Sequence, residues 1–306
     1  NTSDDDAAGI YLHCGTIEMS GGTMSGNKTG NDSGAVKVKQ DGTFIATGTT
    51  FDQNYATTEE GGAIKNFGVT TLTNCTFTGN FAYKAGGAIW NDNNLTINNC
   101  TFKDSNISND KGGAIYSDDK LIINGCTITG NTSKGWGGAI FVGNSSDNVK
   151  IQGAITIKDN TGNGTGSNLY LSDSRKLEMT GTVDDSEIWF GMKNETGTVV
   201  KNYGDYYTSD TIDSYPAKYF KSDDYMGVAR SDDNKDVEVY SAWAKLQEDI
   251  DKATDSATIT LYTDIKATSD DTRLQVNKGQ TITLDLHGHT LNRGLTDDET
   301  NGHVIE

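Results

Sequence analysis

The sequence predicts an all-β fold, a parallel β-helix whose strands stack as a solenoid with about 25 residues per coil. A Gly-Gly-Ala-Ile motif recurs in steps of 25, 26 and 25 residues, starting at Gly61, Gly86, Gly112 and Gly137. Within a repeat, apolar and polar residues alternate with a period of two, which indicates strands. The 306 residues include 36 glycines but one proline, as expected where interior strands need every backbone N–H.

Each repeat contains three short strands separated by tight turns. In one repeat the runs are 95–97, 100–102 and 114–117, and a unit of this size cannot bury its own apolar face. It must stack on its neighbours, and a stack without intervening helices is a parallel β-helix. The first turn carries Gly or Asn, because these residues adopt a left-handed backbone most easily. The turn residues are Gly48, Asn74, Asn99, Gly125 and Gly153.

A second motif, a bulky apolar residue three positions before an asparagine, recurs with the same spacing as the Gly-Gly-Ala-Ile motif. Its copies are Met24/Asn27, Phe51/Asn54, Phe77/Asn80, Ile128/Asn131 and Ile157/Asn160. In the copy at Phe102, Ser105 occupies the asparagine position. Coils lie about 4.8 Å apart, so the asparagines should form an amide ladder that satisfies turn backbone groups. Cys75, Cys100 and Cys126 share an inward ladder, which we interpret as buried thiols and not as a metal or redox site.

The paired GGAI and FxxN repeats resemble those of the chlamydial polymorphic outer-membrane proteins and related bacterial surface proteins. The resemblance covers roughly residues 8–172. It implies a right-handed β-helix of the pectate-lyase-like class and a secreted or surface-anchored bacterial protein, commonly an adhesin. Enzymes on this fold, including pectate lyases, polygalacturonases and lacto-N-biosidases, are the main competing class, because a fold does not decide function.

We expect three parts along the chain. Residues 1–190 should form about seven coils of β-helix. Residues 191–240 should form a closing and connecting segment, because the open end of a β-helix needs a cap. Residues 241–306 should hold a capping helix and the first strands of a second, truncated β-helix.

The capping helix is predicted over residues 241–253, with Ser241 as its N-cap. Residues 284–291, which follow in a strand-like context, are similar to the LDLNGHTL openings of many bacterial surface solenoids. Residues 303–306 stop in strand-like sequence. We therefore expect this chain to be part of a longer polypeptide.

Acidic residues dominate the charge, with 43 Asp and Glu against 25 Lys and Arg and a formal net charge of −18. Such a surface repels phosphate groups, so neither nucleic acid nor anionic membrane is expected as a partner. No apolar run reaches the length of a membrane span, and no membrane insertion is expected within this chain. The sequence contains no P-loop, Rossmann, HExxH or GxSxG motif, and no cofactor is expected.

Paired aspartates could hold Ca²⁺, which prefers oxygen ligands. These pairs include Asp184-Asp185 and Asp223-Asp224. Their spacing matches neither an EF-hand nor a calcium-binding nonapeptide, so we interpret them as surface charge. His287 and His289 flank a glycine, but no third ligand is evident. The sequence therefore predicts no metal site.

An aromatic row is the candidate ligand-binding site. The outward position after the isoleucine anchor carries Trp90, Tyr116 and Phe141 on successive coils, after Lys37 and Lys65 on earlier ones. An exposed aromatic row would suit stacking on sugar rings or contact with a protein partner. The alternative is that the rings only stabilise the sheet by cross-strand packing. The sequence leaves both interpretations open.

The turn after this row carries the candidate catalytic residues Asp92, Asp118 and Asp119. Carboxylates on adjacent coils could lie about 5 Å apart, the separation that retaining glycosidases use for their acid and nucleophile. Under an enzyme hypothesis, Asp92 would act with Asp118 or Asp119. Aspartate is also common in turns because it hydrogen-bonds the backbone, and we favour this second interpretation.

The sequence and the resemblance together predict an extracellular bacterial surface module, secreted or held at the cell surface. It would bind glycans or a host or partner protein in the manner of an adhesin. The alternative is a glycan-active enzyme, either a glycoside hydrolase or a polysaccharide lyase. A structural stalk without a ligand is the second alternative.

Overall fold

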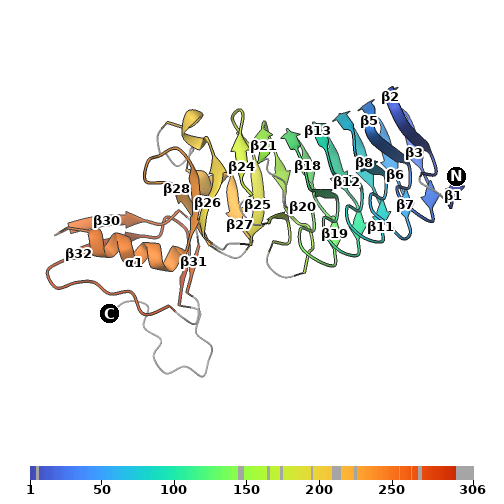
Figure 1. Ribbon diagram of the computed structural model, residues 1–306. Coiled ribbons are helices and arrows are strands. Elements are labelled where there is room, and N and C mark those ends of the chain that lie inside the picture. Colours follow the sequence, from blue (N-terminus) through green and yellow to red (C-terminus); the bar gives the residue numbers. More distant parts are fainter. Residues whose placement is uncertain are drawn as a thin grey trace, which may run out of the picture.

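The computed structural model describes residues 1–4, 7–143, 148–163, 166–172, 175–193, 196–208, 215–223, 226–254, 256–262, 264–267 and 271–293. The protein is nearly all β, a solenoid of about ten turns with parallel stacking, about 26 residues per turn and one short helix. The predicted fold class is therefore confirmed. Figure 1 shows the coils following one another from β1 and β2 at the N-terminal end to β25 and β27, with α1 and β30 beyond them.

The strands form columns along the solenoid, and equivalent strands of successive coils pair in parallel. The first column contains β1 (Thr2–Ser3), β4 (Lys28–Thr29), β7 (Tyr55–Ala56), β11 (Phe81–Ala82), β15 (Ile107–Ser108) and β19 (Thr132–Ser133). The second contains β3 (Thr23–Ser25), β6 (Thr50–Asp52), β10 (Thr76–Thr78), β14 (Thr101–Lys103), β18 (Thr127–Ile128), β22 (Thr156–Ile157), β25 (Glu187–Met192) and β27 (Phe220–Ser222).

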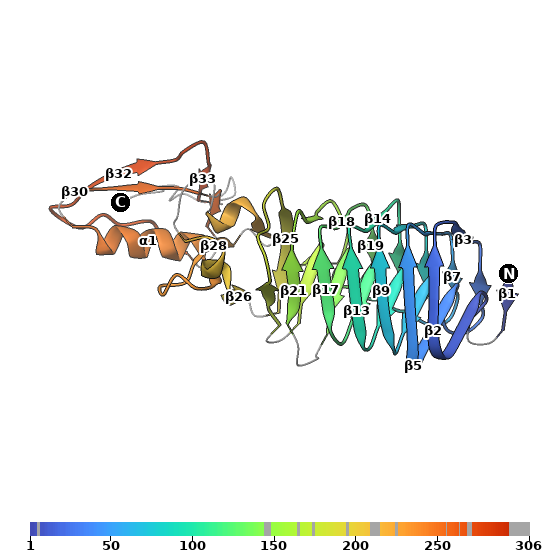
Figure 2. The same cartoon turned by 90° about the horizontal axis from the view of Figure 1, so that it is seen from above.

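The third column begins with two long strands, β2 (Ile10–Ser20) and β5 (Val36–Thr47). In later coils a turn divides this column into two short strands, and Figure 2 shows the longer members side by side. The pairs are β8 (Ile64–Asn66) and β9 (Val69–Thr73), β12 (Ile89–Asn91) and β13 (Asn94–Asn98), β16 (Ile115–Ser117) and β17 (Leu121–Asn124), β20 (Ile140–Val142) and β21 (Val149–Gln152), and β23 (Leu169–Leu171) and β24 (Leu177–Met179).

Both glycines of the repeated motif are required by the backbone. Gly86 has φ of +68°, which L side chains rarely adopt. A Cβ on Gly87 would lie 2.0 Å from the carbonyl oxygen of Gly113 on the next coil. The turn residues behave as predicted, with φ of +53° at Asn74 and +62° at Gly125. The motif therefore sets both the turn and the close approach of neighbouring coils.

The core of the solenoid is a column of fully buried side chains. The rings of Phe51 and Phe77 stack with 4.7 Å between centroids, and Phe77 stacks on Phe102 at 4.5 Å. Free cysteines form a parallel column in the same core. These are Cys75, Cys100 and Cys126, all buried, which confirms their interpretation as packing residues.

The amide ladder runs the length of the solenoid. Each asparagine donates through Nδ2 to Oδ1 of the next, at 2.8–3.0 Å. Its members are Asn27, Asn54, Asn80, Asn106, Asn131, Asn160 and Asn168. The expectation that Ser105 takes one position is wrong, because φ is positive at both Asp104 and Ser105 and the extra residue moves Asn106 into the ladder. The ladder ends on Asp223, whose carboxylate accepts from Nδ2 of Asn168 at 2.8 Å and from its N at 2.9 Å.

Parallel stacking gives way to antiparallel pairing after the long solenoid. Strand β29 (Val237–Tyr240) pairs antiparallel with both β26 (Gly197–Lys201) and β28 (Gly227–Arg230). Two 3-10 helices, η1 (Tyr203–Asp205) and η2 (Pro216–Lys218), lie in the same stretch.

The helix α1 (Ala242–Lys252) follows, and Ser241 caps it by accepting from the N–H of Ala244 at 3.3 Å. The predicted helix and cap are thus confirmed. Its buried face packs in a separate core with Leu261, Ile265 and Leu274. Beyond it β30 (Ser256–Thr260) pairs in parallel with β32 (Thr281–Asp285), and β31 (Ile265–Lys266) with β33 (Leu291–Asn292). The division into domains stays a prediction, and residues 303–306 lie outside the described chain.

Candidate functional site

The predicted aromatic row forms one continuous ladder. Strand register aligns seven side chains, which we call the ladder row: Tyr11, Lys37, Lys65, Trp90, Tyr116, Phe141 and Tyr170. Ring centroids lie 6.3 Å apart between Trp90 and Tyr116 and 5.3 Å apart between Tyr116 and Phe141, with planes within 7° of parallel. The structure therefore brings together the three predicted contact residues.

The faces of these rings are already occupied. Phe141 lies between Tyr116 and Tyr170, and the ammonium group of Lys111 lies 4.8 Å from its centroid. The expectation of an exposed row is wrong for Phe141, which is 5% exposed, whereas Trp90 and Tyr116 are half-buried. Because stacking along the solenoid axis uses the ring faces, the row offers ring edges to a ligand and not the open faces on which a sugar stacks.

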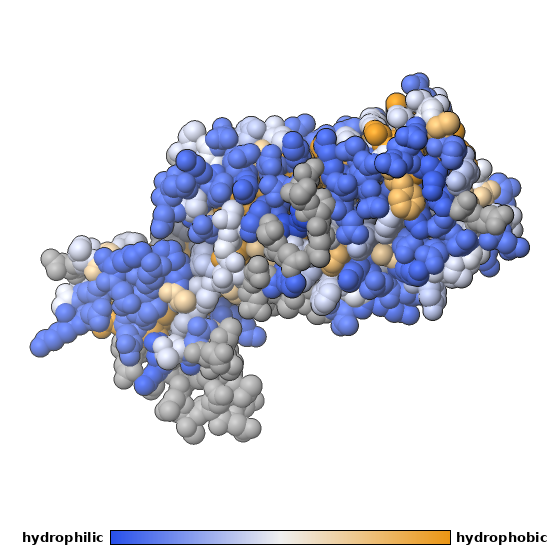
Figure 3. All heavy atoms as spheres, in the orientation of Figure 1, coloured by the Kyte–Doolittle hydropathy of each residue, from blue (hydrophilic) through white to orange (hydrophobic). Residues whose placement is uncertain are grey.

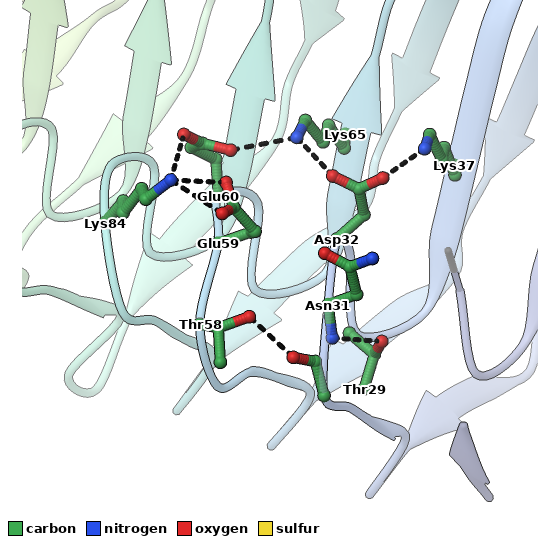
Figure 4. A network of polar contacts seen from close by, with 10 residues as sticks. Thr29, Asn31, Asp32, Lys37, Thr58, Glu59, Glu60, Lys65 and Lys84 are labelled. Atoms are coloured by element: carbon green, nitrogen blue, oxygen red, sulfur yellow. Dashed lines mark hydrogen bonds and ion pairs between the residues drawn. The ribbon is translucent and has the colours of Figure 1, made fainter. Parts of the chain in front are cut away.

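Lysines continue the row toward the N-terminus, and they are buried. Both Lys37 and Lys65 bind the carboxylate of Asp32, as Figure 4 shows, although the sequence placed these lysines outward. Lys65 also contacts Glu60 at 2.8 Å. Burial disfavours the charged form of Asp32, but hydrogen bonds from the two lysines outweigh it and lower the pKa of Asp32. These groups neutralise one another, and Tyr11 follows Lys37 at the N-terminal end of the row.

Three carboxylates of the same network could in principle hold a metal ion. Oxygen atoms of Asp32, Glu59 and Glu60 lie within 4.8 Å of one another. The ammonium groups already bind them, since Lys84 contacts Glu59 at 2.6 Å and Lys65 contacts Glu60 (Figure 4). We therefore interpret the cluster as an ion-pair network between coils.

The predicted catalytic aspartates lie in the turns that divide the third strand column. The hydroxyl of Tyr116 donates to Oδ2 of Asp118 at 2.8 Å, which links the row to this turn. Partial burial raises the pKa of Asp92, and the negative charges of Asp118 and Asp119 add to the effect. Asp119 is exposed and accepts from the N–H of Lys120 at 2.8 Å, as a turn aspartate does. Asp92 therefore keeps its proton to a higher pH than a free aspartate does, mainly because of its partial burial.

A hollow of about 310 Å³ adjoins Asp92. Its lining, which we call the Asp92 hollow, consists of Lys39, Gln40, Phe67, Asp92 and Asn93. Strand β5 continues through Lys39 and Gln40, where its pairing with β2 shifts by one residue, whereas the later coils turn at Phe67 and at Asp92. The hollow thus lies where a continuous strand meets two turns.

The groups around the hollow are held in place by one another. The ring of Phe67 lies 5.0 Å from that of Trp90, and Nδ2 of Asn93 donates to the carbonyl of Phe67 at 3.0 Å. The ammonium group of Lys39 lies 5.4 Å from the Phe67 centroid. Within the described part of the chain, no carboxylate lies close enough to Lys39 for an ion pair. Sequence reasoning missed Lys39, Gln40, Phe67 and Asn93 because the residue type changes from coil to coil. The position after the aligned strands carries Lys39, Phe67, Asp92 and Asp118 in turn.

Two of the paired aspartates considered for calcium, Asp184 and Asp223, have other partners. Asp184 accepts from the hydroxyl of Tyr207 at 2.9 Å, and Asp223 binds Asn168 at the end of the amide ladder. Asp224 lies outside the described residues.

No described helix has both the length and the apolar character that crossing a membrane requires.

Two segments of the chain match a family model, that of the Chlamydia polymorphic membrane protein repeat. The matched residues are 74–92 and 125–148. Each segment contains one asparagine anchor and one Gly-Gly-Ala-Ile motif. The resemblance drawn from these motifs is therefore confirmed. Comparison with curated proteins gives no match, and neither does comparison with solved structures.

Proposed function

We propose that this protein is a bacterial surface module, secreted or held at the cell surface, that binds a glycan in the manner of an adhesin. The matched repeat supports the surface location, because the model describes a membrane-protein family. The Asp92 hollow is the observation that supports glycan binding. It gathers a carboxylate, an ammonium group, two amides and an aromatic ring around one concave surface.

These groups match the chemistry of a neutral sugar. Asp92 can accept hydrogen bonds from sugar hydroxyls, and Lys39 and Asn93 offer donors to ring and hydroxyl oxygens. Phe67 offers an apolar surface for the C–H groups of the ring. Trp90 and Tyr116 would contribute by their edges and by holding this geometry, and Phe141 would support them from within the row.

Binding to a panel of immobilised neutral oligosaccharides tests the proposal. Asp92→Asn and Lys39→Gln should each lower the affinity for the best-binding oligosaccharide about tenfold, since a hydrogen bond to a charged group contributes about 1.5–3 kcal/mol. Asp104→Asn is the matched control, because that side chain is 69% exposed and lies in the turn after β14, in another strand column. Equal binding by wild type and both hollow variants would refute the glycan site. Binding of a host protein alone would favour a protein partner, and binding of neither would favour a stalk.

A glycan-active enzyme is the second candidate function. It is favoured by one observation, the raised pKa of Asp92 beside the charge of Asp118. A carboxyl group that holds its proton longer could act as general acid while an ionised neighbour acts as nucleophile. Release of sugar from the same oligosaccharides that stops in Asp118→Asn would support it. Binding without any turnover would exclude it for those ligands.

A further inference from the structure

Two buried lysines converge on one aspartate between neighbouring coils, near the N-terminal end of the ladder row. Lys37 donates to Oδ2 of Asp32 and Lys65 donates to Oδ1, so each carboxylate oxygen has its own ammonium group (Figure 4). The side chains of Lys37, Lys65 and Asp32 are 7%, 8% and 13% exposed. Keeping charges away from water is costly even when they are paired, and the proposed glycan site gives these groups no role.

A third group contacts the same amine from within its own coil. Oε2 of Glu60 lies 2.8 Å from Nζ of Lys65, and the Glu60 side chain is 19% exposed. Asp32 and Glu60 are equivalent residues, each five positions before a lysine of the ladder row. In the next coil the same two positions carry Ala85 and Trp90. The repeat therefore does not require these charged side chains, and their combination needs another explanation.

Aromatic rings surround the two amines. Nζ of Lys65 lies 5.2 Å from the ring centroid of Trp90 and 5.6 Å from that of Phe67, and Nζ of Lys37 lies 5.8 Å from that of Tyr11. Such walls restrict water, so an uncharged acid and amine come closer in free energy to the ion pair than they do in water.

The ion pair is nevertheless the resting state of this site. Burial raises the pKa of Asp32, but the hydrogen bonds from Lys37 and Lys65 outweigh it, and the pKa lies below its ordinary value. A proton must therefore move from Nζ of Lys65 to Oδ1 of Asp32 before the two groups can react as amine and acid. The hydrogen bond between these two atoms is the path for that proton.

We infer that Lys65 and Asp32 condense to an intramolecular amide bond. After the proton has moved to Oδ1, the amine nitrogen attacks Cγ, and the negative charge that develops on Oδ2 lies against the ammonium group of Lys37. Glu60 takes a proton from the attacking nitrogen and delivers it to Oδ1. The bond between Cγ and Oδ1 then breaks and water leaves. One amide and one water replace one ammonium and one carboxylate group, so atoms and charges balance without a co-reactant.

The fold favours this reaction in two ways. Parallel pairing of β5 with β8 holds Lys37 and Lys65 side by side, which gives the reacting groups a high effective concentration. The network of Figure 4 contains three carboxylates and three ammonium groups, those of Asp32, Glu59, Glu60, Lys37, Lys65 and Lys84. Removing one of each keeps it balanced and ends the cost of two buried charges.

The amide would join two successive coils through residues 33 positions apart. Such a link restricts the unfolded chain and so stabilises the folded one. Because each coil of a solenoid contacts only its neighbours, a covalent link near the N-terminal end would oppose opening of the stack from that end.

Mass spectrometry of the purified, folded chain tests the inference. The intact mass should be lower than the sequence mass by one water molecule, and a protease digest should contain a branched peptide that joins Asp32 to Lys65. Lys65→Arg keeps the charge but offers no amine, and Glu60→Gln removes the proton carrier, so both should keep their full sequence mass. Lys84→Arg is the matched control, since Lys84 is 47% exposed and binds Glu59, and it should still lose the water.

Thermal unfolding gives a second readout. The midpoint should fall by about 5–10 °C in Glu60→Gln and stay near that of wild type in Lys84→Arg. Far-UV circular dichroism at low temperature shows whether each variant is folded. Neither measurement uses a sugar, so the outcome does not depend on the proposed glycan site.

Four results would overturn the inference. The first is a full sequence mass for folded wild type. The second is loss of water from an unbranched peptide, because that is cyclisation and not a link between coils. A branched peptide from Asp32 to Lys37 that persists in Lys65→Arg would contradict the choice of amine. A full yield of the link in Glu60→Gln would contradict the role of Glu60 in proton transfer.

Discussion

Replacing Asn80 by alanine cuts the amide ladder in the middle of the solenoid. Its Oδ1 accepts from the backbone N of Asn54 at 3.1 Å and from Nδ2 of Asn54 at 3.0 Å. Its own Nδ2 donates to the carbonyl of Phe51 at 2.9 Å and to Asn106 at 2.8 Å. All of these groups are buried, so alanine leaves two to three of them without their partner.

Each buried polar group that loses its partner costs about 1–3 kcal/mol. Asn80→Ala should therefore lower the free energy of unfolding by about 3–6 kcal/mol. Urea unfolding followed by far-UV circular dichroism measures this change, with the slope of the transition compared between variants. Because each coil contacts only its neighbours, the two halves of the solenoid could also unfold separately in this variant. A transition with two steps would show that the amide ladder couples the two halves.

Asn98→Ala is the matched control for this prediction. Asn98 is half-buried and belongs to an outer pair, where it donates to Oγ1 of Thr73 at 3.3 Å and accepts from Asn124 at 2.7 Å. Water can replace these bonds, so the loss should be about 1 kcal/mol or less. If Asn80→Ala is no more destabilising than Asn98→Ala, the ladder does not stabilise the solenoid as argued.

Two other changes test the repeat and the end of the ladder. Gly87→Ala places a Cβ 2.0 Å from the Gly113 oxygen and should prevent the central coils from stacking. Gly21→Ala is the control, because no atom lies within 4 Å of its Cβ and only the turn is strained. The midpoint of thermal unfolding should fall much further in Gly87→Ala than in Gly21→Ala. Burial raises the pKa of Asp223 although hydrogen bonds from Asn168 act against it. The native state therefore binds this proton more tightly than the unfolded state, and wild type gains stability as pH falls. The amide oxygen of Asp223→Asn can accept both bonds from Asn168. At neutral pH the free energy of unfolding of this variant should therefore equal that of wild type or exceed it by about 1 kcal/mol, and the difference should disappear in acid. A variant that is less stable than wild type at neutral pH would contradict this account.

Local chemistry explains which parts of the fold could be predicted from the sequence. The glycine pairs, the left-handed turns and the α1 cap depend on nearby residues, and the structure has them where expected. The place of Asn106 was missed because a bulge at Asp104 and Ser105 adds one residue to that coil, which a fixed spacing cannot show.

The candidate site was harder to predict because its contacts join different coils. Lys65 is buried because Asp32, from an earlier turn, neutralises it, and no motif marks this pair. Phe141 is covered by Lys111, whose position in the repeat is held by other residue types elsewhere. The hollow beside Asp92 forms because β5 is one continuous strand where the later coils have a turn. Only the strand pairing in the structure shows this difference.

Hydrogen exchange with and without the best-binding neutral oligosaccharide tests the central claim most directly. The account predicts slower amide exchange at the Asp92 hollow, in peptides that contain Lys39, Phe67 and Asp92, and no change in those around Asp104. At a ligand concentration near the wild-type dissociation constant, Asp92→Asn should lose most of this protection, because its binding is about tenfold weaker. Protection confined to another face of the solenoid, with the hollow unchanged, would contradict the account.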